Sequence, residues 1–179
     1  MNEVKRINRE LKYSGSIVDI YTDTMEFPNG NTEKWDYIAH RKGAAAVLPV
    51  LDNGKLLMVR QYRNTLERQV LEIPAGCRDN VDEPTEECAA RELEEETGYK
   101  AGKIEPLISL CAAVAYCYEM IDVYVATDLV KTKQSLDPNE FVELIECDLE
   151  DLVDKILKGE IVDAKTVAAV MAYKAKYNK

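Results

Sequence analysis

Residues 70–98 constrain the fold of this chain more than any other segment. Val70–Ile73 is a short apolar run typical of a buried strand, and Pro74-Ala75-Gly76 follows it as a tight turn. Residues 77–83 form a polar loop, and Pro84–Thr97 has the pattern of a helix that the following glycine ends. The sequence therefore predicts a strand, a loop and a helix in immediate succession.

Glutamates crowd the C-terminal half of this predicted helix, in the run Arg91-Glu92-Leu93-Glu94-Glu95-Glu96. Because successive helical residues are about 100° apart, Glu92, Glu95 and Glu96 share one face, whereas Glu94 points elsewhere. Like charges at this spacing cost roughly 0.2–0.5 kcal/mol per pair, and the helix dipole disfavours anions at this end. A solvated acidic face is one interpretation. The other is a site for Mg²⁺, which prefers carboxylate oxygens and leaves coordination positions open for phosphates.

The pattern around these glutamates resembles the Nudix box. That motif consists of Gly, five residues, Glu, seven residues, Arg-Glu, an apolar residue, one residue, Glu-Glu, one residue, Gly and a final apolar residue. The matching positions are Glu83, Arg91, Glu92, Leu93, Glu95, Glu96, Gly98 and Tyr99. Six residues instead of five separate Gly76 from Glu83. The insertion lies in the loop, so it leaves the register of the helix unchanged.

Four other stretches resemble the ADP-ribose pyrophosphatase branch of this family. They are Met58–Arg63, Leu71–Gly76, Asn139–Glu143 and Asp163–Thr166. The resemblance implies hydrolysis of the pyrophosphate bond of ADP-ribose, or of a related nucleoside diphosphate sugar, to two monophosphates. That branch usually carries a Ser-Pro pair after the box, whereas this chain has Ala113-Val114 there, followed by Tyr116 and Tyr118. We expect these tyrosines to line the wall beside the terminal sugar, unless they belong to the core.

The resemblance also implies a metal site. Its ligands would be the carboxylates of Glu92 and Glu96, assisted by Glu95, and the carbonyl oxygen of Ala75. Two or three Mg²⁺ ions, for which Mn²⁺ is a substitute, would polarise the diphosphate and acidify the attacking water.

Catalytic roles follow from the same resemblance. Arg91 would hold a carboxylate in place, and Glu83 would brace the loop against the helix. The general base would come from a late mobile loop, where Glu140 is the first candidate and Glu143 the second. Both glutamates have the alternative interpretation of solvent-exposed loop acids.

Substrate contacts are expected from four residues, which are Arg60, Arg63, Glu72 and Trp35. The two arginines share one strand face, or nearly so, and either can grip a phosphate through a bidentate fork. Surface arginines with packed stems are the alternative. Glu72 would hydrogen-bond the ligand, and Trp35 would stack on the base from a partner subunit unless it is an ordinary core or interface residue. The single histidine, His40, is expected to be structural.

The first forty residues have the pattern of strands. Ser16–Phe27 and Thr32–Ala39 flank the turn signal Pro28-Asn29-Gly30-Asn31, so we expect an antiparallel hairpin that buries little on its own. In the ADP-ribose pyrophosphatase branch the N-terminal strands form a subdomain exchanged between two subunits. The resemblance thus implies a subdomain at residues 1–42, a Nudix domain at residues 43–179, and a homodimer.

The rest of the chain alternates strand and helix signals. Ala44–Leu51 and Lys55–Tyr62 flank Asp52-Asn53-Gly54, a strong hairpin signal. Further strands are expected at residues 104–112, 119–126 and 141–147, with a mobile polar loop at 131–140. Asp148 and Asp163 are expected to cap two helices, whose apolar faces include Leu157 and Met171 respectively. The predicted fold is α+β, an α/β/α Nudix sandwich with an N-terminal antiparallel β subdomain.

Composition limits the partners. The 179 residues carry a net charge of −10, which argues against duplex nucleic acid but not against a small nucleotide bound with a cation. No apolar run approaches the roughly 20 residues of a membrane span, and Met1–Glu10 lacks a signal-peptide core. The five cysteines form no CxxC pair, so free thiols are expected. A cytoplasmic location follows as the expectation.

Two rival functions are weighed against hydrolysis. A catalytically silent Nudix-like nucleotide-binding or sensor module would show eroded carboxylates, and here they are all present. A structural protein that binds Ca²⁺ is disfavoured because residues 78–83 lack the spacing of an EF-hand loop.

Overall fold

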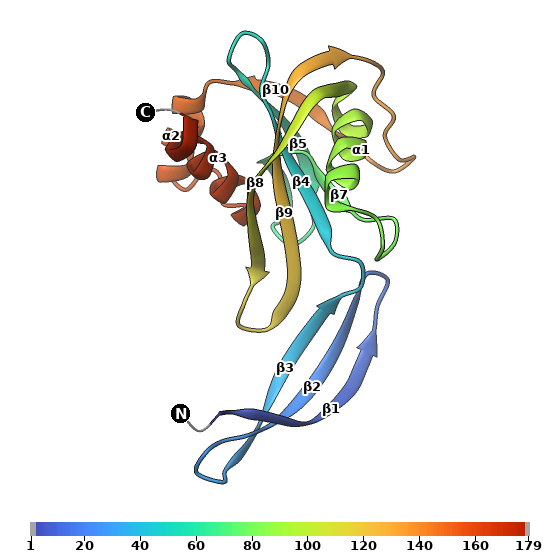
Figure 1. The fold of residues 1–179 in the computed structure, drawn as a ribbon, viewed down its shortest axis with the longest axis vertical. Coiled ribbons are helices and arrows are strands. Elements are labelled where there is room, and N and C mark those ends of the chain that lie inside the picture. The colour runs from blue at the N-terminus through green and yellow to red at the C-terminus, as the bar shows by residue number, and fades with distance from the viewer. Residues whose placement is uncertain (1–2, 178–179) are drawn as a thin grey trace.

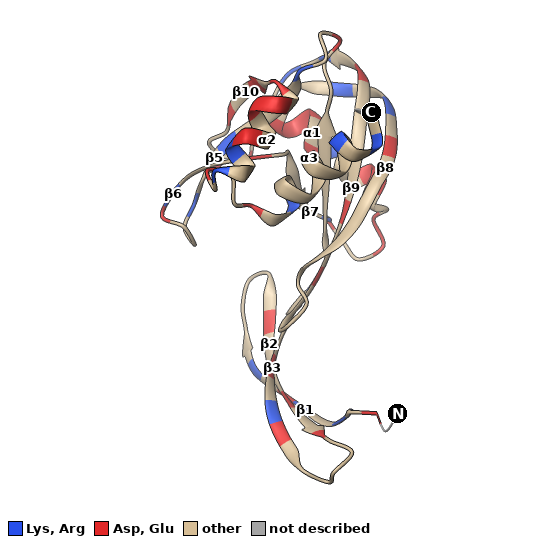
Figure 2. Cartoon of the chain, turned by 90° about the vertical axis from the view of Figure 1, so that its left-hand side faces the viewer, with Lys and Arg blue, Asp and Glu red and all other residues tan. Residues whose placement is uncertain are grey.

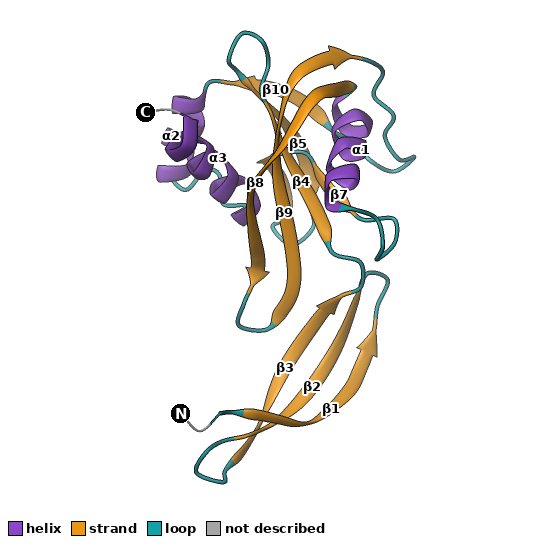
Figure 3. Ribbon diagram, in the orientation of Figure 1, coloured by secondary structure: helices purple, strands orange, loops and turns teal. Residues whose placement is uncertain are grey.

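Helices cover both faces of a central sheet in the computed structural model, which describes residues 3–177 (Figures 1 and 3). The strands are β1 (Lys5–Ser14), β2 (Val18–Glu26), β3 (Thr32–His40), β4 (Ala44–Pro49), β5 (Leu56–Arg63), β6 (Arg68–Glu72), β7 (Ala75–Cys77), β8 (Tyr99–Ala113), β9 (Cys117–Lys131) and β10 (Glu143–Cys147). The helices are α1 (Thr85–Thr97), α2 (Leu149–Leu157) and α3 (Ala164–Tyr177). The larger sheet has the order β1-β2-β3-β9-β4-β7 with β8 paired to β9, and the smaller one has the order β10-β5-β6.

The strand β4 explains why the core has two halves. Successive strand residues face opposite sides of a sheet, and every residue of β4 is buried. Ala46 and Leu48 belong to the cluster that contains side chains of α2 and α3. Ala45 and Val47 belong to the cluster that contains Leu93 of α1. The sheet is therefore covered by α1 on one face and by α2 and α3 on the other, which confirms the predicted α/β/α sandwich.

The expected hairpin of β4 and β5 is wrong, although its turn forms. The amide of Gly54 donates to the carbonyl of Leu51 at 2.8 Å, and Val50 forms an isolated bridge with Leu56. Beyond that bridge the strands separate, since β4 pairs with β7 and β9 whereas β5 pairs with β6 and β10. A wholly apolar strand such as β4 needs neighbours on both edges and both faces, which a two-stranded hairpin does not provide.

The N-terminal strands form an antiparallel sheet that projects from the rest of the molecule (Figure 1). The expected pair is β2 and β3, and β1 adds a third strand at the edge. This sheet joins the remaining strands through a short parallel pairing of β3 with β9, at Ile38 with Cys117 and Ala39 with Tyr118. The long hairpin of β8 and β9 therefore reaches down to the N-terminal sheet.

Two predicted apolar helix positions are wrong. Leu157 is 77% exposed and Met171 is 40% exposed, because the buried faces of α2 and α3 are formed by residues such as Leu152 and Val170 instead. The Asp163 carboxylate does cap α3, accepting a hydrogen bond from the amide of Thr166 at 3.0 Å. Within residues 3–177 no helix is both long enough and apolar enough to cross a bilayer.

Candidate active site

The orientation of α1 is set by the side chains that it buries. Ala89 and Leu93 pack with β4 residues in the core, and Thr97 is also buried. Pro84 precedes the first helical residue, and Gly98 ends the helix with φ 66°. Because the packed face is fixed, the face that carries the glutamates turns toward β7 and the loop that follows it. Figure 2 shows this acidic segment as red bands on α1.

Glu96 is the most deeply buried acid of the site, at 1% exposure. Its Oε2 accepts a hydrogen bond from the amide of Ala75 at 3.2 Å. Burial, together with the charges of Glu140 and Glu92, raises the pKa of Glu96 to about 8. Among the described residues, no lysine or arginine forms an ion pair with this carboxylate. Glu96 is thus shielded from water without a cation to neutralise it.

Glu92 lies one turn before Glu96 and against Gly76. A Cβ atom at Gly76 would overlap the Glu92 carboxyl group, so only glycine allows this close approach. Arg91 Nη1 donates to Glu92 Oε1 at 2.7 Å, but burial outweighs this bond and raises the pKa of Glu92. Glycine is therefore required at the end of the Pro-Ala-Gly turn, because β7 passes directly beside the Glu92 carboxylate.

Arg91 links the loop to the helix. Its guanidinium bonds Glu83 Oε1 at 3.2 Å, Glu95 Oε2 at 3.0 Å and the carbonyl of Cys77 at 3.1 Å, besides Glu92. Burial opposes ionisation of Glu83, yet the Arg91 bond and the amide of Asp79 lower the pKa of Glu83 overall. Arg91 therefore contacts the loop residue Glu83, the carbonyl of Cys77 and two glutamates of α1.

Arg78 was missed by the sequence analysis. Its Nε donates to the carbonyl of Lys42 at 2.6 Å and its Nη1 to the carbonyl of Val81 at 2.8 Å. It therefore ties the loop that carries the one-residue insertion to the end of the N-terminal segment. A lone arginine in a polar loop gives no local signal for such a role.

Glu140 reaches the carboxylate face, whereas Glu143 does not. A cavity of about 380 Å³ is lined by Glu140 together with Ala75, Glu92 and Glu95. The charge of Glu140 also contributes to the raised pKa values of Glu92 and Glu96. Glu143 begins β10 instead, where its Oε2 accepts a bond from Arg60 Nη1 at 3.1 Å.

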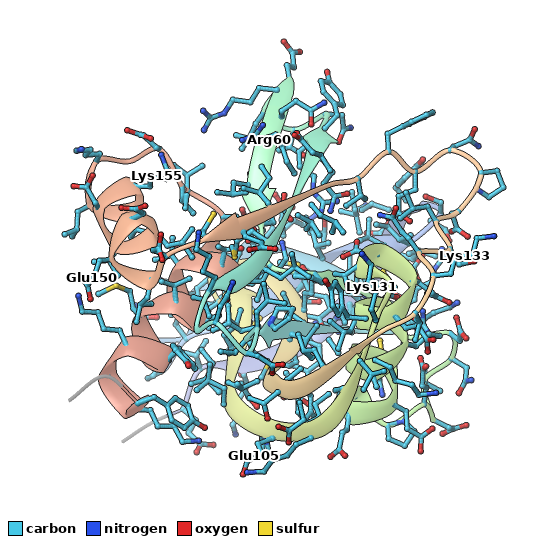
Figure 4. The ribbon with its side chains drawn as sticks, turned by 90° about the horizontal axis from the view of Figure 1, so that it is seen from above. Arg60, Glu105, Lys131, Lys133, Glu150 and Lys155 are labelled. Carbon is cyan, nitrogen blue, oxygen red and sulfur yellow. The ribbon has the colours of Figure 1, made fainter. Side chains whose placement is uncertain are left out.

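Arg60 and Arg63 point to opposite faces of β5, so the expectation of a shared face is wrong. Residues three apart on a regular strand alternate sides, and no bulge interrupts the pairing of β5 with β6. Arg60 is exposed at its pair with Glu143 (Figure 4). Arg63 lies on the other side, where it donates two bonds of 2.7 Å to Glu72.

Glu72 is neutralised by a second cation that the sequence did not reveal. Lys165 Nζ donates to Glu72 Oε2 at 2.6 Å and also lies 3.0 Å from Asp163. Arg63 and Lys165 line a second cavity, of about 400 Å³, whose wall includes Ala75 and Gly76. The charged groups of Arg63 and Lys165 thus share a cavity with β7, the strand next to Glu92.

Trp35 and the two tyrosines lie away from the carboxylates of the same chain. Trp35 is on β3, 46% exposed, with its ring edge-on to Phe27. Tyr116 and Tyr118 are 53% and 58% exposed beside the N-terminal sheet, so they are not core residues. His40 Nδ1 accepts a hydrogen bond from the amide of Gly43 at 2.9 Å, a structural contact.

The oxygens that gather here are those a hard divalent cation takes. Within residues 3–177, no three acidic, histidine or cysteine side chains already form a coordination set. The guanidinium of Arg91 forms ion pairs with the carboxylates of Glu92 and Glu95 and so balances part of their negative charge. Glu96, buried and without a cation, is the donor whose environment most requires added positive charge.

Comparisons with known proteins identify the family of the chain. The model of the NUDIX domain matches residues 40–170. An ADP-ribose pyrophosphatase of Bacillus subtilis is 41% identical, with 97% of this chain and 94% of that protein covered. A methanol dehydrogenase activator of Bacillus methanolicus is 42% identical, with 94% and 91% covered. A crystal structure of an ADP compounds hydrolase, 23% identical, shares the fold with a TM-score of 0.87 over 98% of this chain and 94% of the other.

The family match spans most of the chain, and it includes the loop, helix and strand that surround the glutamates. The chain belongs to the Nudix family.

Proposed function

We propose that this protein hydrolyses the pyrophosphate bond of ADP-ribose or a related nucleoside diphosphate sugar. Water adds to one phosphorus, and the bridging oxygen leaves with the other, so that two monophosphates form. The observation that carries the proposal is the cavity of about 380 Å³ that Glu92, Glu95 and Glu140 line, large enough for a diphosphate. The charges of Glu92 and Glu140 also act on the buried carboxylate of Glu96. The full-length similarity to a protein named ADP-ribose pyrophosphatase supports this substrate class.

A divalent metal ion is general among Nudix pyrophosphatases of this kind, and we propose Mg²⁺, with Mn²⁺ as a substitute. Its ligands would be Glu92, Glu95, Glu96 and the carbonyl of Ala75. A bound cation supplies charge neutralisation for the diphosphate and acidifies the attacking water.

The chain's own residues supply the rest of the chemistry. Arg91 orients Glu92 and Glu95, because it bonds both carboxylates. Glu140 is the proposed general base, since it lines the same cavity as Glu92 and Glu95, and it takes the proton that the attacking water loses. Glu143, paired with Arg60 on β10, is the second candidate.

Substrate recognition is assigned to the second cavity and its edges. Two nitrogen atoms of Arg63 already bond Glu72, and the remaining donors of its fork are available to a phosphate. Arg60, exposed on β5, is proposed to contact the distal part of the substrate, and Glu72 to act mainly through Arg63. Trp35 would stack on a base only in a partner subunit.

We also propose that residues 1–42 form a subdomain exchanged in a homodimer, and that residues 43–179 form the hydrolase domain. The N-terminal sheet exposes Ile7, Leu11 and Tyr13, each by more than half, on a three-stranded unit with little core of its own. A cytoplasmic location is supported by the free thiols of the described cysteines, because such thiols persist in a reducing compartment.

The test is hydrolysis of a substrate panel at millimolar Mg²⁺ or Mn²⁺ and in EDTA. The panel contains ADP-ribose, other nucleoside diphosphate sugars, a dinucleotide and nucleoside triphosphates. We expect metal-dependent release of two monophosphates, with ¹⁸O from labelled water in one of them. Binding of ADP-ribose without cleavage would instead identify the silent nucleotide-binding module, and cleavage of triphosphates alone would refute the substrate class.

The dimer is tested separately. Light scattering of the full chain should give twice the monomer mass, and deletion of residues 1–42 should abolish activity. A stable, fully active monomer of residues 43–179 would contradict the exchanged subdomain.

A further inference from the structure

The first half of the loop between β9 and β10, residues 132–142, is fastened to the C-terminal end of α1. The amide of Thr132 donates to the carbonyl of Gly98 at 2.7 Å, and the amide of Ser135 to the carbonyl of Glu95 at 2.9 Å. The side-chain amide of Gln134 donates to the carbonyl of Glu96 at 2.6 Å. The expectation of a mobile loop over residues 131–140 is therefore wrong for its first residues.

Topology explains why the loop arrives at this place. The strand β8 starts directly after Gly98, and β9 returns antiparallel to it, with Lys131 opposite Tyr99. Thr132 therefore lies next to the helix end, where the last carbonyls lack donors within the helix. Gly98 permits the approach, because a Cβ atom there would lie 2.7 Å from the amide nitrogen of Gln134.

Gln134 differs from its two neighbours in how it holds the helix. Thr132 and Ser135 donate through backbone amides, which almost any residue possesses. Gln134 donates through its side chain, so this contact depends on the residue type. Its acceptor is the backbone carbonyl of Glu96, the residue whose carboxylate is buried at the site.

The loop beyond Ser135 is short and folded on itself. The amide of Glu140 donates to the carbonyl of Asp137 at 2.9 Å, and the amide of Asp137 donates to Glu140 Oε2 at 3.4 Å. Only Leu136 separates this compact turn from Ser135. The position of the turn, and with it the Glu140 carboxylate, therefore follows from where residues 134 and 135 are attached.

We propose that Gln134 is a positioning residue, whose bond to the Glu96 carbonyl fixes the Asp137–Glu140 turn over the carboxylates of α1. The inference rests on the proposed function, because that function gives Glu140 its role as base. The C-terminal end of α1 then has two functions. It contains Glu96, and through its bond to Gln134 it determines the position of Glu140.

The experiment compares Gln134→Met with Lys133→Met in the full-length protein. Methionine preserves the length of glutamine but has no donor. Lys133 is the adjacent residue, and its side chain points outward from the loop (Figure 4). We expect Gln134→Met to lower kcat on the cleaved substrate about tenfold, with KM changed less than about threefold and Mg²⁺ dependence unchanged. Lys133→Met should leave all of these values near wild type.

Amide hydrogen exchange supplies a second readout that does not need turnover. Residues 136–142 should exchange faster in Gln134→Met than in wild type, while α1 and the melting temperature stay unchanged. Unchanged exchange or unchanged kcat would overturn the proposal, as would a general loss of stability with kcat and KM affected alike. If the wild-type protein cleaves nothing in the panel, the proposed function fails, and exchange alone then decides whether Gln134 holds the turn.

Discussion

Glu72 and Glu96 are buried to the same degree, at 2% and 1% exposure, but their electrostatic surroundings are opposite. Glu72 accepts hydrogen bonds from both Arg63 and Lys165. Burial would raise its pKa, yet these cations lower the pKa of Glu72 overall. Glu96 accepts one backbone amide bond and feels the charge of Arg63 only weakly, so burial and the charges of Glu140 and Glu92 raise its pKa to about 8.

The difference is between a buried carboxylate that the chain's own cations neutralise and one that lacks such an ion pair. A buried charge that the chain neutralises itself joins distant elements, as Glu72 joins β6 to α3 through Lys165. A buried carboxyl group without such a partner costs stability when it ionises, and groups of this kind are concentrated at functional sites. Removing each carboxylate should therefore have opposite consequences for activity and for stability.

The largest expected effect is on turnover in Glu96→Gln. Glutamine preserves shape but removes the charge, so kcat/KM on the cleaved substrate should fall at least about a hundredfold. The melting temperature in metal-free buffer should stay equal or rise, because an uncompensated buried carboxyl is gone. Near-normal turnover at saturating Mg²⁺ would contradict the metal assignment, and a large loss of stability would make Glu96 structural.

Glu72→Gln should lower the stability of the fold more than Glu96→Gln does. It leaves two cations without their shared buried partner, so the free energy of unfolding in urea should drop by about 3 kcal/mol. The matched control is Asp154→Asn, which removes an exposed pair with Lys158 and should cost less than about 1 kcal/mol. Equal losses in the two variants would show that burial of Glu72 is not decisive.

The pH dependence of stability should separate the two glutamates in metal-free protein. Glu72 has a lowered folded pKa, so its contribution is present above the unfolded pKa of about 4.3 and is lost as pH falls below it. Glu96 has a raised folded pKa, so folded protein keeps a proton that unfolded protein releases, and stability should fall as pH rises from about 4.3 toward 8.

Urea unfolding between about pH 3 and pH 8 measures both slopes. The downward slope above pH 5 should be smaller in Glu96→Gln, whose neighbours Glu92, Glu140 and Arg63 are unchanged. A slope identical to wild type would mean that Glu96 is ionised in the folded protein despite its burial.

The smallest expected effect is that of Lys165→Met. Arg63 still neutralises Glu72, so we expect a loss of about 1 kcal/mol, compared with almost none for Lys174→Met on the exposed part of the same helix. A loss as large as that of Glu72→Gln would show that Lys165, rather than Arg63, is the decisive partner.

The family and the sandwich were predicted correctly, because the motif that identifies the family is local and the family has this fold. A motif of fixed spacing on one helix keeps its geometry wherever the helix packs. The hairpin of β4 and β5 failed for the opposite reason: its turn is local, but the partners of each strand lie far along the chain. Sequence spacing also gave no means of separating Glu140 from Glu143.

The sequence by itself determined the type of chemistry, since it lists the carboxylates, their helical register and the glycines that let β7 and the late loop approach them. Only the tertiary structure decided which buried glutamate is neutralised. Lys165 and Glu72 are 93 residues apart, and their ion pair exists only once α3 is packed beside β6. The charge state of a buried group depends on what surrounds it in space, and no local pattern of residues encodes that surrounding.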